Sequence, residues 1–239
     1  MLRDLLATLP KPDDNAELLV GNDTGDDAAV YRIDETRAIV ATTDFFMPVV
    51  DDPFDFGRIS ATNALSDVYA VGGRPILALA ICGMPIDKVT SKVIRDVLAG
   101  GAAVCKNAGV PVAGGHSIDT LEPIYGLAVI GMVDIANIKR NIGAQPDDVL
   151  ILGKGLGTGF MSNAVKSGTI SDSGYAELIA STTRLNDIGY DLGAREDVHA
   201  MTDITGFGLL GHLSEVCQGS GVGAKLELSA IPMLAAGRE

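Results

Sequence analysis

The sequence predicts an α/β (α+β) protein built as two domains. Of its 239 residues, 47% are hydrophobic and 21% are charged, a balance that suits a chain with a buried core. Strand-like apolar runs alternate with stretches of helical periodicity. A polar, turn-rich segment at residues 134–148 then divides the chain. We therefore expect an N-terminal domain at residues 1–135 and a C-terminal domain at residues 145–239.

The first half of the chain reads as a series of strands and helices with recognisable ends. Thr90 can cap the second long helix and Gly109 can end it, while Gly100 and Gly101 inside it indicate either close packing or a break. The predicted elements begin with a short helix at 2–9, a strand at 18–20, an acidic loop at 21–27, strands at 28–33 and 38–43, and a solvated loop at 51–57. They continue with a helix at 58–71, a strand apolar on both faces at 76–82, a helix at 90–108 and a long strand at 124–133.

The second half begins with a strand at 149–152 and a glycine-rich loop at 153–159. This loop fits neither the P-loop pattern nor the dinucleotide-binding pattern, so it is a weak signal. Helices are expected at 172–189 and at 206–217, the latter capped by Thr205 with Leu209, Leu210, Leu213 and Val216 facing inward. A short strand at 224–228 follows, which leaves the second domain incomplete.

Charge and cysteine content narrow the functional classes. The net charge of −13 and the lack of a Lys/Arg cluster disfavour nucleic acid and anionic membranes as partners. No apolar run approaches the roughly 18 residues needed to span a bilayer, and no signal-peptide pattern opens the chain. Cys82, Cys105 and Cys217 form no C-x-x-C pair and read as buried, reduced thiols. A cytoplasmic protein is expected.

An acidic stretch, Gly21-Asn22-Asp23-Thr24-Gly25-Asp26-Asp27, is the strongest chemical signal. Two like charges about 4 Å apart repel by roughly 1 kcal/mol in water, and by several times more at an effective dielectric constant of about 20. A divalent cation converts this repulsion into binding. If the chain is extended here, Asp26 and Asp27 point to opposite faces, so only one of them reaches a metal.

Three later aspartates fit the same site. Asp44 ends a strand, Asp67 shares a helix face with Ser60 and Asn63, and Asp203 precedes a helix. Each has a simpler explanation: a strand cap, a solvated helix face, or a helix-dipole charge worth about 0.3–1 kcal/mol. Together with Asp27 they would form a hard-oxygen site for Mg²⁺ or Mn²⁺ rather than zinc, and no EF-hand loop is present. Magnesium with open positions favours phosphoryl transfer on a nucleotide.

Adjacent glycines at 114–115, followed by His116 and Ser117, give a weaker signal. Glycines let backbone amides approach an anion, and the two side chains add donors. A plain turn with a surface histidine is the alternative.

Six motifs together resemble the selenophosphate synthetase (selenide, water dikinase) family, within the aminoimidazole ribonucleotide synthetase superfamily that also includes thiamine-monophosphate kinase. The resemblance runs from about Leu18 to the C-terminus. The motifs are Gly-Asn-Asp-Thr-Gly-Asp-Asp-Ala-Ala-Val-Tyr at 21–31, Thr-Thr-Asp-Phe-Phe-Met-Pro at 42–48, Asp-Phe-Gly-Arg-Ile at 55–59, Thr-Asn-Ala-Leu-Ser-Asp at 62–67, Ala-Gly-Gly-His-Ser-Ile-Asp at 113–119 and Thr-Asp-Ile-Thr-Gly-Phe-Gly-Leu-Leu-Gly-His at 202–212.

The resemblance implies an aminoimidazole ribonucleotide synthetase-like fold whose N-terminal mixed sheets pair in a homodimer. It implies Mg²⁺-dependent conversion of ATP, selenide and water to selenophosphate, AMP and phosphate, with selenide free or brought by a delivery protein. The residues implied are Asp27, Asp67 and Asp203 for magnesium, and Thr24, Gly25, Asp26, Asp44 and Asp67 for ATP, with Gly115, His116 and Ser117 completing the nucleotide site from the same or the partner subunit.

One departure limits this expectation. The family's glycine-rich segment with a Cys or selenocysteine and a catalytic Lys would precede Met1, so no catalytic residue is assigned here. The C-terminal domain is also shorter than in the family. We expect the chain to bind Mg-ATP weakly or partly and to make little or no selenophosphate. The alternatives are another small-acceptor ATP-dependent kinase or synthetase of the superfamily, or a non-catalytic nucleotide-binding dimer module.

Overall fold

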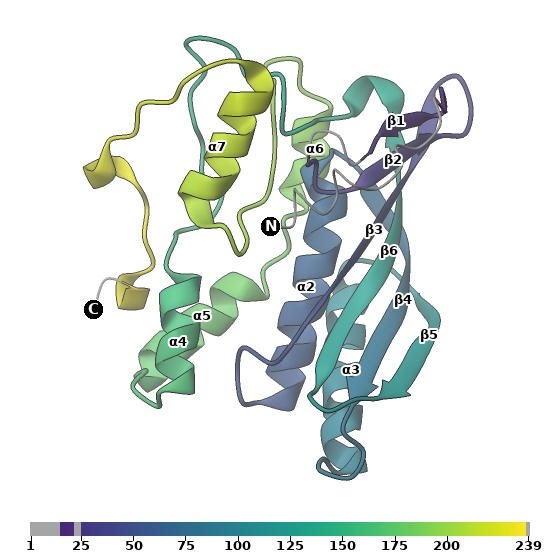
Figure 1. Ribbon diagram of the computed structural model, residues 1–239, viewed down its shortest axis with the longest axis vertical. Helices are drawn as coiled ribbons and strands as arrows, with labels where there is room; N and C mark the ends of the chain where they lie inside the picture. The colour runs from purple at the N-terminus through teal and green to yellow at the C-terminus, as the bar shows by residue number, and fades with distance from the viewer. Residues whose placement is uncertain (1–14, 22–24, 238–239) are drawn as a thin grey trace.

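The computed structural model describes residues 15–21 and 25–237, so the helix expected at 2–9 lies outside the described residues. A six-stranded mixed sheet forms the first half, with two long helices on one face (Figure 1). The strands lie in the order β1 (Leu18–Val20), β2 (Ala29–Arg32), β3 (Arg37–Phe46), β6 (Ile124–Asp134), β4 (Arg74–Met84) and β5 (Val112–Asp119). All neighbours pair antiparallel except β4 and β5, which are parallel. The predicted mixed α/β architecture is confirmed.

Helix α2 (Pro53–Ala70) is the central element of the fold. Asp52 caps it by accepting a hydrogen bond from the Asp55 amide at 2.9 Å, and Pro53 occupies the first turn, where its missing N–H costs nothing. The prediction of a solvated loop at 51–57 was therefore wrong, because its Asp-Pro pair is a helix start. The helix is buried on most of its surface, since it contacts the sheet, α3, α5 and α6.

Glycines let α3 (Ser91–Asn107) pack closely against α2. A Cβ on Gly100 would lie 2.0 Å from the Phe54 carbonyl oxygen, and a Cβ on Gly57 would lie 2.0 Å from the Val97 carbonyl oxygen. Gly100 and Gly101 thus mark close packing rather than a break, since α3 runs through them. The predicted ends are confirmed: Thr90 accepts a hydrogen bond from Val93 N, and Gly109 has a φ of +71°.

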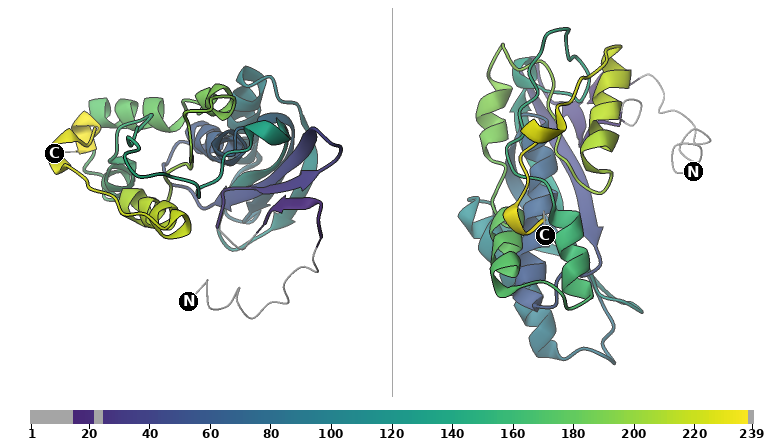
Figure 2. Two further views of the ribbon diagram at one scale, coloured as in Figure 1. Left: turned by 90° about the horizontal axis from the view of Figure 1, so that it is seen from above. Right: turned by 90° about the vertical axis from the view of Figure 1, so that its left-hand side faces the viewer.

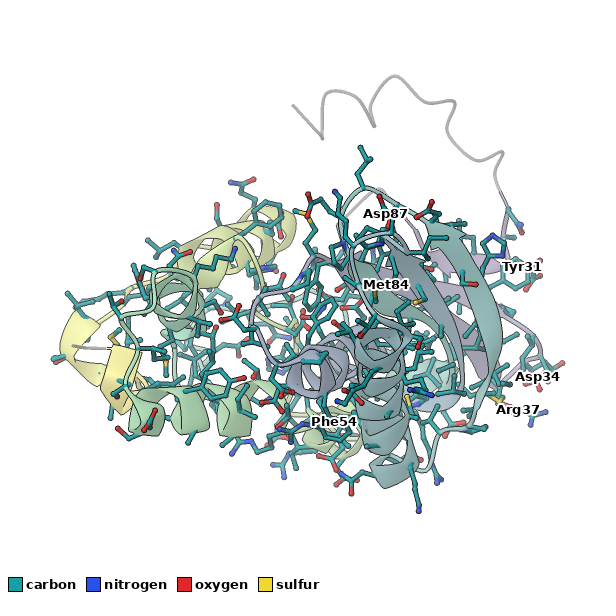
Figure 3. All side chains as sticks on the ribbon, turned by 90° about the horizontal axis from the view of Figure 1, so that it is seen from below. Tyr31, Asp34, Arg37, Phe54, Met84 and Asp87 are labelled. Atoms are coloured by element: carbon teal, nitrogen blue, oxygen red, sulfur yellow. The ribbon has the colours of Figure 1, made fainter. Side chains whose placement is uncertain are left out.

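No described residue covers the sheet face opposite the helices. We expected the strand at 76–82 to be covered on both faces, but Ile76 is 45% exposed and Leu79 is 38% exposed. Figure 3 shows Tyr31, also exposed, on the outer side of the sheet. That expectation was wrong because α2 and α3 both lie on the other face. The apolar pattern of a strand does not show what covers each of its faces.

The second half of the described chain is helical and lies beside α2, on the side away from the sheet (Figure 2). Its helices are α4 (Thr158–Lys166), α5 (Asp172–Thr182), α6 (Ile188–Gly193) and α7 (Gly208–Ser220), with 3-10 turns η1 (Ile135–Asn137), η2 (Leu228–Ala230) and η3 (Ala235–Gly237). The single helix expected at 172–189 is two helices, α5 and α6. None of the described helices has both the length and the apolar character needed to cross a bilayer.

The strands expected at 149–152 and 224–228 are absent from the described structure, and this prediction was wrong. Val149 and Ile151 are 81% and 88% exposed, and neither segment pairs with a strand. A strand forms only where a neighbour takes up its N–H and C=O groups, and the isolated bridge described in this half joins Leu156 to Met233.

The start of α7 also differs from expectation. Thr205 does not cap it, since its backbone N–H donates to His212 Nε2 at 3.1 Å and the helix begins at Gly208. Leu210 is 72% exposed rather than facing inward, whereas Val216 is buried.

The glycine contacts between α2 and α3 give a stability test. Gly100→Ala should lower the free energy of unfolding by about 1–3 kcal/mol, because the new methyl group meets backbone that cannot rotate away. Gly159→Ala in α4 is the matched control, because nothing lies within 4 Å of its Cβ; it should be neutral or stabilising by up to about 1 kcal/mol. Urea unfolding measures both, and equal effects would contradict the packing argument.

Candidate functional site

Four aspartates from separate elements face one another beside α2. Asp27 lies in the loop before β2, Asp44 in β3, Asp67 in α2 and Asp203 in the loop before α7. The charge of Asp203 acts on the other three carboxyls, and Asp67 also interacts with Asp27 and Asp44. We call these four residues the aspartate cluster. The structure thus brings together the three predicted metal ligands and Asp44.

The sheet and α2 supply neutral donors that hold two of these carboxylates. The inward positions of β3 change from apolar at Ala38 and Val40 to polar at Thr42 and Asp44. Thr42 Oγ1 donates to Asp67 Oδ2 at 2.6 Å, and Asn63 Nδ2 donates to Asp44 Oδ2. These contacts rule out the simpler reading of this part of α2 as a solvated face.

The third polar residue predicted on that helix face, Ser60, has a different environment. It is fully buried and donates to the Phe56 carbonyl at 2.9 Å, one turn earlier in the helix. It therefore plays no part in the cluster.

The other two aspartates are each held by a hydroxyl group, Asp27 by Thr202 in the loop before α7 and Asp203 by Ser66 in α2. Thr202 Oγ1 donates to Asp27 Oδ1 at 3.0 Å. Asp203 is hydrogen-bonded by Ser66, which itself accepts a hydrogen bond from Asn186 Nδ2 at 2.7 Å. Asp27 Oδ2 is buried and has no hydrogen-bond partner among the described residues. A buried carboxylate oxygen without a partner is energetically costly, so this atom is suited to binding a cation.

Burial changes the acidity of the whole cluster. Burial first, and the nearby Asp203 charge second, raise the pKa of Asp27 and of Asp67 to about 8. Burial also raises the pKa of Asp44 and of Asp203. When ionised, the cluster would carry more negative charge than its surroundings neutralise, and its donor set is all oxygen, which fits a hard divalent cation.

The cluster is open rather than a closed cage. Within residues 15–21 and 25–237, no three His, Cys, Asp or Glu side chains lie close enough together to hold a metal ion. An ion held here would therefore need further ligands from water or from a substrate, as is usual for magnesium.

Asp26 has different partners from its neighbour Asp27, although the backbone at Asp27 is a bend rather than extended. Its Oδ2 pairs with Arg140 Nη2 at 3.1 Å, and its Oδ1 accepts the Asn141 amide at 2.9 Å. Asn141 Nδ2 also donates to the Gly25 carbonyl at 2.7 Å. The Asp26 side chain thus fixes the acidic loop to the segment that follows β6.

The remaining predicted nucleotide residues are not near the cluster within this chain. Gly115, His116 and Ser117 lie in the exposed edge strand β5, so the alternative of a plain turn was wrong. Strands β6 and β4 separate β5 from β3, which amounts to roughly 14 Å at the usual strand spacing. Thr24 lies outside the described residues.

Sequence reasoning missed several residues that shape the site. Ser66 and Thr202 stand inside quoted motifs, next to the predicted ligands, but were given no role. Lys154 belongs to the glycine-rich loop that matched no nucleotide pattern, yet its charge acts on Asp203. Nothing in the local sequence pointed to Asn186 or Asn141, because their contacts join segments far apart in the chain.

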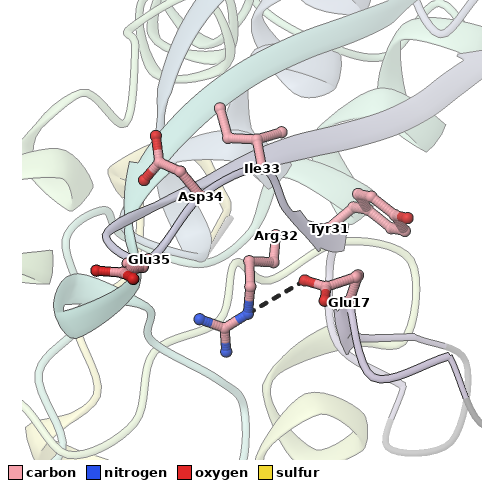
Figure 4. Close-up of a pocket in the computed structure, with 6 residues that line it drawn as sticks. All are labelled: Glu17, Tyr31, Arg32, Ile33, Asp34 and Glu35. Carbon is pink, nitrogen blue, oxygen red and sulfur yellow. Dashed lines mark ion pairs between the residues drawn. The ribbon is translucent and has the colours of Figure 1, made fainter.

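A surface hollow at the β2–β3 end of the sheet is separate from this site. Figure 4 shows its lining: Glu17, Tyr31, Arg32, Ile33, Asp34 and Glu35. Arg32 pairs with Glu17 at 3.4 Å, and no member of the aspartate cluster lines the hollow. We assign no function to it.

Comparison with known proteins adds to this geometry. The family AIR synthase related protein, N-terminal domain, matches residues 25–133, and the AIR synthase related protein, C-terminal domain, matches residues 145–238. The chain is 58% identical over 235 residues to selenide, water dikinase of Burkholderia pseudomallei, which covers 98% of this chain and 66% of that protein. Seven further relatives of that name are 54–61% identical, so the chain spans about two thirds of the length of the curated relatives it matches.

Solved structures share the fold at lower identity. AaThiL complexed with AMPPCP and TMP has a TM-score of 0.78 at 19% identity, covering 98% of this chain and 74% of that one. Hydrogenase maturation protein HypE in complex with ATP has a TM-score of 0.73 at 20% identity, covering 94% of this chain and 67% of that one.

The raised pKa values predict how stability depends on pH without metal. A carboxyl whose pKa is higher in the folded protein than the ordinary 3.8 favours folding most below that pH, and this contribution is lost as the pH rises toward 8. In EDTA the free energy of unfolding should therefore fall between about pH 4 and 8, by up to about 1.4 kcal/mol per pH unit for each group.

Asp67→Asn should flatten this pH dependence and be more stable than the wild type at pH 8 in EDTA, because it removes one of the like charges. Added magnesium should restore the stability of the wild type, and most strongly at pH 8. Asp172→Asn, at an exposed position at the start of α5, is the control and should leave the slope unchanged. Thermal unfolding at a series of pH values measures the effect; a slope unaltered in Asp67→Asn would show that the cluster is not destabilising when ionised.

Proposed function

This chain belongs to the selenide, water dikinase family of AIR synthase related proteins, and we propose that its aspartate cluster binds ATP with Mg²⁺. The reaction proposed for the whole protein is the conversion of ATP, selenide and water to selenophosphate, AMP and phosphate.

The proposal includes the division into domains at 1–135 and 145–239. It also places the protein in the cytoplasm, supported by the free thiols of Cys82, Cys105 and Cys217.

The observation that carries the proposal is the uncompensated negative charge around Asp27. Its Oδ2 is buried without a partner, and its pKa and that of Asp67 are raised to about 8 by burial and by Asp203. Asp27, Asp67 and Asp203 would hold magnesium, with phosphate oxygens and water as the further ligands. The bound ion would supply positive charge to the phosphates during in-line transfer.

The residues around the cluster would position these ligands. Thr42, Asn63 and Thr202 each donate to one carboxylate, which fixes its orientation and leaves its other oxygen for a ligand. Phosphoryl transfer needs mainly positioning and charge stabilisation, so such preorganisation is the contribution this half of the protein can make.

The nucleotide would lie against the same cluster. Asp44 and Asp67 are proposed to contact ATP, together with the backbone of Thr24, Gly25 and Asp26. Gly25 has a φ of +66°, and the Arg140 pair holds Asp26, so this loop has a defined conformation where it leads to Asp27. Two proteins of the same fold, AaThiL and HypE, have structures complexed with AMPPCP and ATP respectively, which supports nucleotide use.

The uncovered sheet face supports a homodimer. Phe45, Gly126, Ile81 and His116 are cross-strand neighbours and so form one row on this face. The next row contains Thr43, Ala128 and Leu79. A second copy is the proposed occupant, since an apolar sheet face of this extent is seldom left in water. His116 and its neighbours Gly115 and Ser117 would then complete the nucleotide site of the partner.

Calorimetry with Mg-ATP tests the proposed binding. The wild-type chain should bind, and Asp67→Asn should weaken binding by at least about tenfold, the effect of losing one strong charged contact. Asp172→Asn should bind as the wild type does. Equal binding by wild type and Asp67→Asn would remove the metal-site argument. Phosphorus NMR with added selenide tests the reaction itself. The longer relatives, measured in the same way, are the reference.

Dimer formation is tested by sedimentation of variants on the sheet face. Leu79→Asp should convert the protein to a monomer, because a carboxylate would be buried in the interface without a partner. Leu121→Asp is the control, since Leu121 is 83% exposed outside the strands of this face, and it should remain dimeric. A monomeric wild type at micromolar concentration, or a dimeric Leu79→Asp, would contradict the proposal.

A further inference from the structure

The glycine-rich loop at 153–159 has no role in the proposed function, and its lysine lies near enough to the aspartate cluster for its charge to act on Asp203. Lys154 is half-buried, and its Nζ donates to the Arg184 carbonyl. In return Arg184 Nη2 donates to the Gly153 carbonyl at 2.6 Å. These reciprocal hydrogen bonds fix the loop to residues 183–187, the link between α5 and α6.

The same link also holds a member of the cluster. Asn186, two residues after Arg184, donates to Ser66 Oγ at 2.7 Å, and Ser66 is hydrogen-bonded to Asp203. One short segment therefore determines where both Lys154 and Asp203 lie. The two charges interact, since Lys154 lowers the pKa of Asp203 and Asp203 raises that of Lys154. The lysine is thus a cation at the edge of an otherwise acidic site.

The hydrogen bonding of Lys154 leaves it able to bind a ligand. An ammonium group has three N–H donors, and among the residues that the structure describes Arg184 O is the one acceptor it contacts. Burial first, and the Arg184 charge second, lower its pKa to about 8, which means that the folded chain does not fully stabilise this cation. A phosphate group would provide both the missing acceptors and the missing negative charge.

We propose that Lys154 is an ATP-binding residue that contacts the phosphate chain beside the magnesium-binding aspartates. This inference rests on the proposed function, because it assigns a further residue to the same nucleotide site. Magnesium would neutralise the phosphate oxygens that face Asp27, Asp67 and Asp203, and the lysine would neutralise those that face the glycine-rich loop.

A purely structural role makes a different prediction. If Lys154 served only to tie the loop to the α5–α6 link, the hydrogen bond to Arg184 O would matter and the charge would not. Lys154→Gln keeps a donor for that carbonyl and removes the charge, whereas Lys154→Arg keeps the charge. The two variants therefore separate the roles.

The experiment measures the Kd of Mg-ATP by calorimetry on the full 239-residue chain, with unfolding midpoints to show that each variant is folded. Lys154→Gln should raise the Kd by about tenfold or more, and Lys154→Arg should stay within about threefold of wild type. Lys166→Gln, an exposed lysine in the last turn of α4, is the matched control and should leave the Kd unchanged.

The outcomes separate this inference from the proposed function. If wild type binds Mg-ATP and Asp67→Asn does not, yet Lys154→Gln binds as wild type, the lysine assignment alone is overturned. It is also overturned if Lys154→Gln and Lys154→Arg lose affinity and stability equally. If wild type binds no Mg-ATP, the proposed function fails and the assignment fails with it.

Discussion

Four aspartate side chains that repel one another share a partly buried space, and the surrounding structure exists to hold them there. Each carboxylate is held by a neutral donor or by a neighbouring loop: Thr42 for Asp67, Asn63 for Asp44, Thr202 for Asp27, and Ser66 for Asp203. Neutral donors fix the direction in which a carboxylate points without cancelling its charge. When the carboxyls ionise, their charge is available to a cation, and the raised pKa values of Asp27 and Asp67 reflect the cost of leaving that charge uncompensated.

Helix α2 can carry part of this site because its packing is tight elsewhere. Its close contact with α3 depends on Gly57 and Gly100, and its apolar residues Phe56 and Leu65 lie in the core. Asn63 and Asp67 then face β3 at the one stretch where that strand turns polar. A rigid scaffold with a local polar layer is what preorganised ligand groups require, because flexible ones would relax apart.

Much of the N-terminal half could be predicted from the sequence. Thr90 and Gly109 marked the ends of α3, because caps are local interactions within a few residues. Strands β2, β3, β4 and β6 were recognised by their β-favouring runs, whereas β5 was not predicted. Asp27, Asp67 and Asp203 were singled out as oxygen ligands for a metal, and this role stays a prediction. The strands expected at 149–152 and 224–228 do not form, because apolar runs without a neighbouring strand stay unpaired. Strand formation depends on a partner that local sequence does not reveal.

The sequence by itself predicted which residues would carry the chemistry, because short carboxylates beside glycines and at strand ends are a local pattern that indicates ligand groups. Only the tertiary structure decided which of them meet. It turned Asp26 toward Arg140 and Asp27 toward the cluster, left Gly115, His116 and Ser117 on a distant edge strand, and brought Lys154 and Asn186 to the site. These placements depend on contacts between segments far apart in the chain, which no local pattern of residues encodes.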